Sequence, residues 1–134
     1  MKSYVMDDNW ESMDTVSDQT ALVTGASKGI GRAIALDLAA QGIFVFINYR
    51  SDKAAAQKTR DKIHFRNGQA AVIGCNVTSQ DQCDAAVKQI LQQRGRLDIL
   101  VNNAGIRDDH LFAMMKKSSW ETVIQTHLTG FYHL

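Results

Sequence analysis

Three glycines fall within seven residues in TGASKGIG, which covers positions 24–31. The apolar run TALV precedes them, and the amphipathic stretch GRAIALDLAAQG follows. Glycine adopts positive φ and lets another group approach the backbone closely. We therefore expect a buried strand that turns sharply into a helix, with the unpaired N–H groups at the start of that helix open to a ligand.

Apolar and amphipathic stretches alternate along the rest of the chain. Four short apolar runs predict buried parallel strands, at residues 20–25, 43–49, 70–77 and 97–105. Helical spacing predicts helices that start at the glycine-rich turn, at Ser51 or Asp52, at Ser79, and at Ser118 or Ser119. The alternation indicates an α/β fold, a Rossmann-like doubly wound parallel sheet that here extends to a fourth strand and the helix after it. Right-handed crossovers then give the strand order 3-2-1-4.

Helical spacing also groups apolar residues along the helices. In the first helix it relates Ile30, Ala33, Ile34, Asp37, Leu38 and Gln41, most of which are apolar, and in the third it predicts an inner face of Ala85, Ala86, Ile90 and Leu91. The last helix carries one apolar stripe, Trp120, Val123, Ile124, Leu128 and Phe131, which a monomer would leave in water. Gly42 and Gly68 follow the first two helices, a common position for glycine after a helix C-terminus.

Charge divides the chain into an N-terminal tail and one domain. Residues 1–18 carry five acids against one lysine, which predicts an acidic, poorly ordered tail, whereas residues 19–134 hold all the predicted strands and helices. The formal net charge of +1 gives no argument for binding to nucleic acid or a membrane. The N-terminus lacks the apolar segment of a signal peptide, and the longest apolar run, Ile43–Ile47, is too short to span a bilayer.

Cysteine and histidine spacing gives no sign of a metal site. Cys75 and Cys83 lack the CxxC spacing, and the four histidines lack the spacing of metal ligands. Cysteines without a disulfide pattern predict a reducing, cytoplasmic setting.

The glycine-rich turn is expected at the carboxyl end of the first strand, where doubly wound sheets bind their ligands. Here the N–H groups and the positive dipole end of the following helix favour a pyrophosphate. A glycine-rich turn without a ligand is the alternative. Because a strand precedes the turn and a helix follows it, the pattern favours a dinucleotide-binding domain over residues 19–134.

Two motifs together resemble the short-chain dehydrogenase/reductase family. The first is TGASKGIG, with its GxxxGxG spacing, and the second is NNAG at positions 102–105, which matches the sheet-stabilising motif of that family. The resemblance runs from about Gln19 to Leu134. Within the family, GASKGIGRAIA, VNNAGI and LTGFYHL look most like 3-oxoacyl-(acyl-carrier-protein) reductases. The resemblance implies hydride transfer to a ketone on an acyl-carrier-protein-linked or other carbonyl substrate, in fatty acid biosynthesis.

The resemblance also implies which residues hold the nicotinamide cofactor. Arg50 follows the second strand, where NAD enzymes carry an acid for the ribose 2′-hydroxyl. A guanidinium there pairs with a 2′-phosphate, and Lys28 adds a second cation, so we expect NADP(H). Asp52 is the counter-indication, since a small shift in register would bring it closer. The expected cofactor residues are Gly25, Ser27, Lys28, Gly29, Ile30, Gly31, Tyr49, Arg50, Asn76, Val77, Asn103, Ala104 and Gly105.

Two of these expectations depend on the family pattern at single positions. Asn76 stands where the family usually has an aspartate that contacts the adenine amino group, and its side-chain carbonyl oxygen could accept the same hydrogen bond. His127 stands where the family has the asparagine that holds a proton-relay water. Histidine also bonds to water, but a histidine without a catalytic role is the alternative that we favour.

The family's catalytic serine, tyrosine and lysine follow the segment that matches LTG at 128–130. We assign none of them here, and we expect these 134 residues to lack the Tyr-x-x-x-Lys motif and to be inactive alone. Two interpretations remain open: the cofactor-binding half of a reductase, or an inactive module that binds a dinucleotide or a protein. The apolar fourth strand and the stripe on the last helix predict a homo-oligomer or a second polypeptide that completes the sheet.

Overall fold

The computed structural model describes residues 18–106 and 114–134. Residues 1–17, which make up the predicted tail apart from Asp18, lie outside the described residues, as do residues 107–113 between the fourth strand and the last helix. Four strands form a parallel sheet in the order β3-β2-β1-β4, so the predicted fold class and strand order are confirmed. The strands are β1 (Thr20–Val23), β2 (Phe44–Tyr49), β3 (Ala70–Gly74) and β4 (Ile99–Val101).

The register aligns the carboxyl ends of the strands along one edge of the sheet. Leu22 of β1 pairs with Phe46 on one side and with Leu100 on the other. All four strands are shorter than predicted. Residues after β1, β3 and β4 leave the hydrogen-bonded ladder to form loops at this edge, whereas β2 loses only its first predicted residue, and β4 also loses two at its start.

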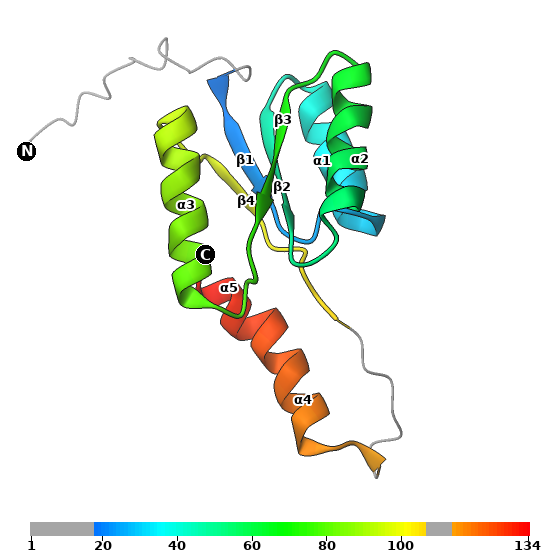
Figure 1. The fold of residues 1–134 in the computed structure, drawn as a ribbon, viewed down its shortest axis with the longest axis vertical. Helices are drawn as coiled ribbons and strands as arrows, with labels where there is room; N and C mark the ends of the chain where they lie inside the picture. The colour runs from blue at the N-terminus through cyan, green and yellow to red at the C-terminus, as the bar shows by residue number, and fades with distance from the viewer. Residues whose placement is uncertain (1–17, 107–113) are drawn as a thin grey trace, which may run out of the picture.

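Helices cover both faces of the sheet (Figure 1). α1 (Gly29–Ala40) and α2 (Lys53–Phe65) pack on one face, and α3 (Gln80–Arg94) packs on the other. Beyond β4 the chain forms α4 (Lys117–Ile124), the π-helix η4 (Gln125–Thr129) and the short α5 (Gly130–Tyr132). α4 extends away from the carboxyl edge of the sheet (Figure 1).

The alternation of side chains along β1 divides the core into two layers. Ala21 and Val23 face α1 and α2, whereas Leu22 faces α3. All three are buried, as expected for a parallel strand covered on both sides.

The buried faces of α1 and α3 differ in part from the positions that the sequence pattern indicates. The buried residues of α1 are Gly31, Ala35 and Ala39, and Ile30 is 75% exposed. Small residues on this face let α1 lie close to the sheet. In α3 the buried face is Cys83, Ala86 and Ile90, whereas Leu91 and Ala85 lie on the exposed side.

The helix starts also differ in detail from the prediction. Asp52 caps α2, because its Oδ1 accepts a hydrogen bond from the Ala55 N–H at 2.9 Å. Ser79 precedes α3 as predicted, although its side chain makes no capping bond. α4 starts at Lys117, one residue before the first of the two predicted serine caps, with Lys116 at the cap position.

Candidate functional site

An open groove of about 750 Å³ lies at the carboxyl edge of the sheet, within the size range of small-molecule sites. It is bordered by the loops that follow β1, β2 and β4. Its described lining residues are Gly25, Ser27, Lys28, Gly29, Ile30, Tyr49, Arg50, Ser51, Asp52, Asn103, Ala104, Gly105 and Ile106. The structure thus brings together most of the predicted cofactor residues from three loops far apart in the sequence.

The glycine-rich loop has the backbone that its sequence indicates. Gly25 and Gly29 have φ values of 62° and 60°, in the left-handed region that favours glycine. Gly31 lies under the groove, where a Cβ would come within 2.7 Å of the Gly25 carbonyl oxygen and would also collide with the Asn103 side chain. Glycine at 31 therefore lets the start of α1 pack against both neighbouring loops.

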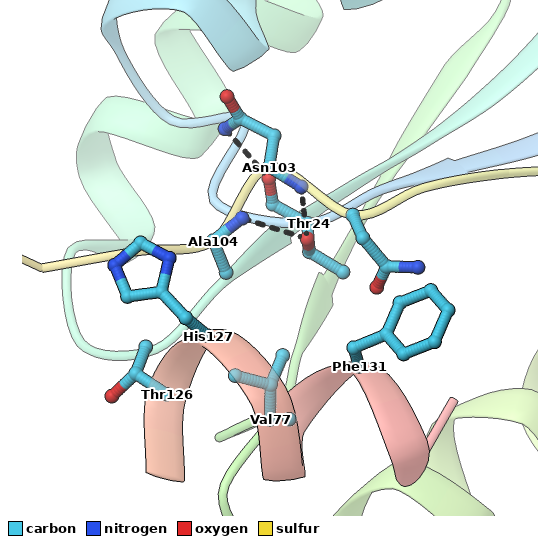
Figure 2. A pocket seen from close by; sticks show the side chains of 9 residues that line it. Thr24, Val77, Asn103, Ala104, Thr126, His127 and Phe131 are labelled. Carbon is cyan, nitrogen blue, oxygen red and sulfur yellow. Dashed lines mark hydrogen bonds between the residues drawn. The ribbon is translucent and has the colours of Figure 1, made fainter. Parts of the chain in front are cut away.

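A hydrogen-bonded network joins this loop to NNAG (Figure 2). The buried Thr24 hydroxyl accepts from the backbone N–H groups of Asn103 and Ala104, each at 2.9 Å, and donates to the Val101 carbonyl at 3.2 Å. The Asn103 side-chain NH₂ donates back to the carbonyls of Thr24 at 2.9 Å and Gly25 at 3.3 Å. The ends of β1 and β4 are thereby held together beneath the groove.

Asn48 was not predicted as a site residue, yet it fixes the loop to the second and third strands. Its side chain is buried in β2, its Oδ1 accepts the Gly25 N–H at 3.2 Å, and its Nδ2 donates to the Cys75 carbonyl at 3.0 Å. Its own carbonyl accepts the Ala26 N–H at 3.0 Å. A polar side chain inside the apolar run IFVFINY was the available signal, because buried amides need partners.

Two exposed cations line the groove beside one capping carboxylate. Lys28 comes from the glycine-rich loop and Arg50 from the residue after β2. Asp52 also lines the groove, but its Oδ1 is engaged with the Ala55 N–H at the start of α2. This region of the groove therefore offers charge pairing to an anion.

The structure does not bring Asn76 and Val77 to the groove lining that it describes. The Asn76 Oδ1 accepts from the Thr78 backbone N–H at 3.2 Å and from the Thr78 hydroxyl at 3.0 Å. The oxygen assigned to an adenine contact thus bonds within its own loop. The adenine contact stays a prediction.

Val77 lines a second cavity, of about 70 Å³, below the ends of β1 and β4 (Figure 2). The other described lining residues are Thr24, Asn102, Asn103, Ala104, Thr126, His127, Gly130 and Phe131. His127 lies in the π-helix η4, and its Nε2 is 3.0 Å from the Ile106 carbonyl oxygen. Its ring fills the space that a Cβ at Gly105 would need. His127 therefore connects η4 to the end of the groove formed by NNAG.

The expectation that the Tyr-x-x-x-Lys spacing is absent is wrong. Tyr49 and Lys53 have this spacing in the sequence YRSDK. Tyr49 ends β2 and Lys53 begins α2, so the two residues do not lie one turn apart on a helix. The Tyr49 ring packs beside β3, where a Cβ at Gly74 would come within 3.1 Å of the Tyr49 hydroxyl. This match in spacing therefore does not place the two side chains on one helix.

The two cysteines form a buried pair of free thiols. Their Sγ atoms lie 3.6 Å apart. Burial raises the pKa of Cys75 to about 12 and also raises the pKa of Cys83. Both thiols are thereby kept protonated as packing groups behind the Asn76–Ser79 loop. Within residues 18–106 and 114–134, no cluster of three His, Cys, Asp or Glu side chains is arranged to hold a metal, and no helix is long and apolar enough to cross a membrane.

A family model described as short chain dehydrogenase matches residues 19–134. The chain belongs to the short-chain dehydrogenase family. Among curated proteins, it is 44% identical over 115 residues to the 3-oxoacyl-[acyl-carrier-protein] reductase FabG of Staphylococcus aureus, a match that covers 86% of this chain and 47% of the relative. It is 43% identical over 120 residues to the 3-oxoacyl-[acyl-carrier-protein] reductase of a Synechocystis species, covering 90% of this chain and 49% of the relative.

A solved structure supports the same assignment for the fold. A metagenomic short-chain oxidoreductase in complex with NADP has a TM-score of 0.83 and 34% sequence identity to this chain. The match covers 90% of this chain and 55% of the other. This short-chain dehydrogenase chain spans about half the length of the curated relatives it matches.

Proposed function

We propose that this chain is the NADP(H)-binding half of a carbonyl reductase similar to the 3-oxoacyl-[acyl-carrier-protein] reductases. The observation that carries the proposal is the pair of cations, Lys28 and Arg50, in the groove beside the glycine-rich loop. The loop is held against the end of β2 by the bond from the Ala26 N–H to the Asn48 carbonyl, so both cations belong to one region of the groove. The NADP complex of the similar metagenomic structure and the names of the curated relatives support it.

Each part of the groove has a role in this proposal. The start of α1 offers backbone N–H groups and a positive dipole end to the pyrophosphate. Arg50 pairs with the 2′-phosphate, and Lys28 adds charge beside it. Ala104 and Gly105 form the groove wall after β4, on the side of His127. When bound, the cofactor supplies the hydride for a carbonyl carbon of an acyl-carrier-protein-linked substrate.

Cofactor titration tests the proposal. NADPH should bind the chain at least about tenfold more tightly than NADH, because one charge-assisted contact contributes about 1.5–3 kcal/mol. Arg50→Asp should remove or reverse this preference. Arg66→Asp is the matched control, because Arg66 is an exposed arginine at the opposite end of α2. Equal affinity for the two cofactors in the unaltered chain would contradict the proposal.

An inactive dinucleotide-binding module is the second candidate, and His127 is the observation that favours it. The His127 ring packs on Gly105 and is engaged with the Ile106 carbonyl. In this candidate the 134-residue chain binds NADPH but does not oxidise it with a 3-oxoacyl thioester, because its described residues position no general acid, a group that contributes roughly 10²–10⁴-fold to rate. Steady turnover that persists in His127→Ala would eliminate this candidate.

A further inference from the structure

The carbonyl of Ser27, inside the glycine-rich loop, accepts hydrogen bonds from two side chains, Arg32 and Thr59. Arg32 of α1 donates to it through Nη2 at 2.6 Å and through Nε at 3.2 Å. The Thr59 hydroxyl of α2 accepts from the Arg32 Nε at 3.1 Å, and its one proton is within reach of two carbonyls, Ser27 at 3.1 Å and Ala55 at 3.2 Å. Thr59 is fully buried. A charged donor and a buried hydroxyl thus both contact one carbonyl of the loop.

This anchor sets the direction of the next peptide group. In a planar trans peptide, the C=O of one residue and the N–H of the next point in opposite directions. Because the Ser27 carbonyl is directed at Arg32 and Thr59, the Lys28 N–H is turned away from them. Lys28 itself is the exposed residue that precedes α1 and lines the groove.

The hydrogen bond between Thr59 and Ser27 joins the two backbone segments that carry Lys28 and Arg50. Lys28 follows Ser27 directly, and Thr59 belongs to the helix that begins three residues after Arg50. A bond between Ser27 and Thr59 therefore holds the loop that carries Lys28 against the helix that follows Arg50. The guanidinium of Arg32 donates hydrogen bonds to the Ser27 carbonyl and the Thr59 hydroxyl, so it holds the loop in place.

We propose that Arg32 and Thr59 are positioning residues that set the preference for a 2′-phosphorylated cofactor by fixing the Ser27–Lys28 peptide relative to Arg50. This inference rests on the proposed function. In this inference Arg32 holds the glycine-rich loop and does not bind the phosphate directly. Loss of the Thr59 hydroxyl then weakens the response to the 2′-phosphate without removing any charge.

Thr59→Val, which keeps the shape and removes the hydroxyl, is the decisive variant. It should lower NADPH affinity by about threefold to tenfold, the effect of one hydrogen bond, and should leave NADH affinity within about twofold. Thr59→Ser retains the hydroxyl and should restore the affinity for NADPH. Arg32→Lys, which keeps the charge but loses the two-pronged contact, should reproduce the selective loss and keeps the test open if Thr59→Val folds poorly.

Salt dependence separates positioning from charge. Arg50→Ala should flatten the dependence of NADPH affinity on salt, because a paired charge is lost. Thr59→Val should leave that slope unchanged. An equal loss of NADPH and NADH affinity in Thr59→Val, or no loss, would overturn the inference.

Amide hydrogen exchange in the cofactor-free chain supplies an independent readout. Exchange of residues 27–29 should be faster in Thr59→Val than in the unaltered chain or in Thr59→Ser. If exchange there is unchanged, the inference fails whatever the titrations show. If the unaltered chain does not prefer NADPH, the proposed function fails, and the exchange data still decide whether Arg32 and Thr59 hold the loop.

Discussion

The Thr24 hydroxyl oxygen lies 2.9 Å from the backbone nitrogen of Asn103, a residue 79 positions later in the chain. The same oxygen accepts the Ala104 N–H at 2.9 Å and donates its proton to the Val101 carbonyl. One side chain directly after β1 thus accepts from two N–H groups of the loop that follows β4.

Thr24→Val should destabilise the chain because it removes the acceptor of the Ala104 N–H, whereas the Asn103 N–H keeps the Val101 carbonyl at 3.1 Å. The expected loss is about 1–3 kcal/mol for each donor left unsatisfied. Urea unfolding followed by circular dichroism measures the free energy of unfolding. Thr24→Ser keeps the hydroxyl and should lose less than Thr24→Val. Equal stability of the valine and serine variants would show that the network does not hold the two loops together.

Two glycines separate backbone strain from a role in binding. Gly29 and Gly95 have φ values of 60° and 75°, and no neighbouring atom lies within 4 Å of a Cβ built at either position. Alanine at each should therefore cost a similar amount, about 1–2 kcal/mol for the left-handed conformation. Gly29 lines the groove, whereas Gly95 ends α3.

Gly29→Ala should consequently weaken NADPH binding, and Gly95→Ala should not. Thermal unfolding checks that the two variants lose comparable stability, and fluorescence titration measures the affinity for NADPH. If both variants bind NADPH as the unaltered chain does, the start of α1 is not part of the binding surface.

The sequence predicted the fold well because its signals are local. Each strand is a short apolar run, and turn or capping residues such as Asp52 and Gly42 mark the helix ends. The inner faces were predicted less well, because the packing of small residues such as Ala35 and Ala39 decides how α1 is rotated on the sheet. Hydrophobicity alone favoured Ile30, which the structure exposes beside the groove.

The motifs predicted most residues that line the groove, but the side chains that hold its loops in place were not predicted. Asn48 bonds to Gly25 and Cys75, which lie 23 and 27 positions away, and Arg32 meets Thr59 at a separation of 27. Such partners become visible only when the strands and helices are placed beside one another. The second cavity and the engagement of Asn76 with Thr78 likewise depend on loop conformations that residue spacing does not specify.

Asp98 gives stability a defined dependence on pH. Its carboxylate accepts hydrogen bonds from Arg96 and from the Thr20 N–H at 2.8 Å, and these contacts lower the pKa of Asp98 below its ordinary value of 3.8. A lowered pKa in the folded state means that the folded protein favours the charged form. Its contribution to stability is therefore complete above the ordinary pKa and is lost as the pH falls through the lowered value.

Asp98→Asn should remove this part of the acid sensitivity and should lower stability at pH 7. Urea unfolding at pH values from 7 to 3 measures the effect. Asp37→Asn, at an exposed position of α1, is the control and should leave the stability at pH 7 nearly unchanged. A parallel fall in stability with acid for the unaltered chain and Asp98→Asn would contradict the assignment.

The buried thiols should react only when the chain opens. With its pKa at about 12, Cys75 carries almost no thiolate at pH 8, and the Cys83 thiol is fully buried beside it. Modification by a thiol reagent should be slow in the native chain and should accelerate with unfolding in urea. Rapid modification of either cysteine in buffer alone would show that the region behind the Asn76–Ser79 loop is open.

An exposed apolar surface predicts self-association. Trp120 is 53% exposed, and Leu128 and Phe131 are each 63% exposed, along α4, η4 and α5. β4 lies at an edge of the described sheet, and residues 97–101 contain no proline and one charge, Asp98. Neither feature opposes pairing with another chain.

We expect the chain to form dimers or larger species at micromolar concentration through this surface. Leu128→Glu should shift the population toward monomer, because a charge would be buried without a partner in the contact. Phe65→Glu is the matched control, since Phe65 is 90% exposed at the end of α2, and it should leave the assembly unchanged. Sedimentation velocity measures the distribution, and a monomer in the unaltered chain, or an equal response to both substitutions, would rule out this surface as the contact.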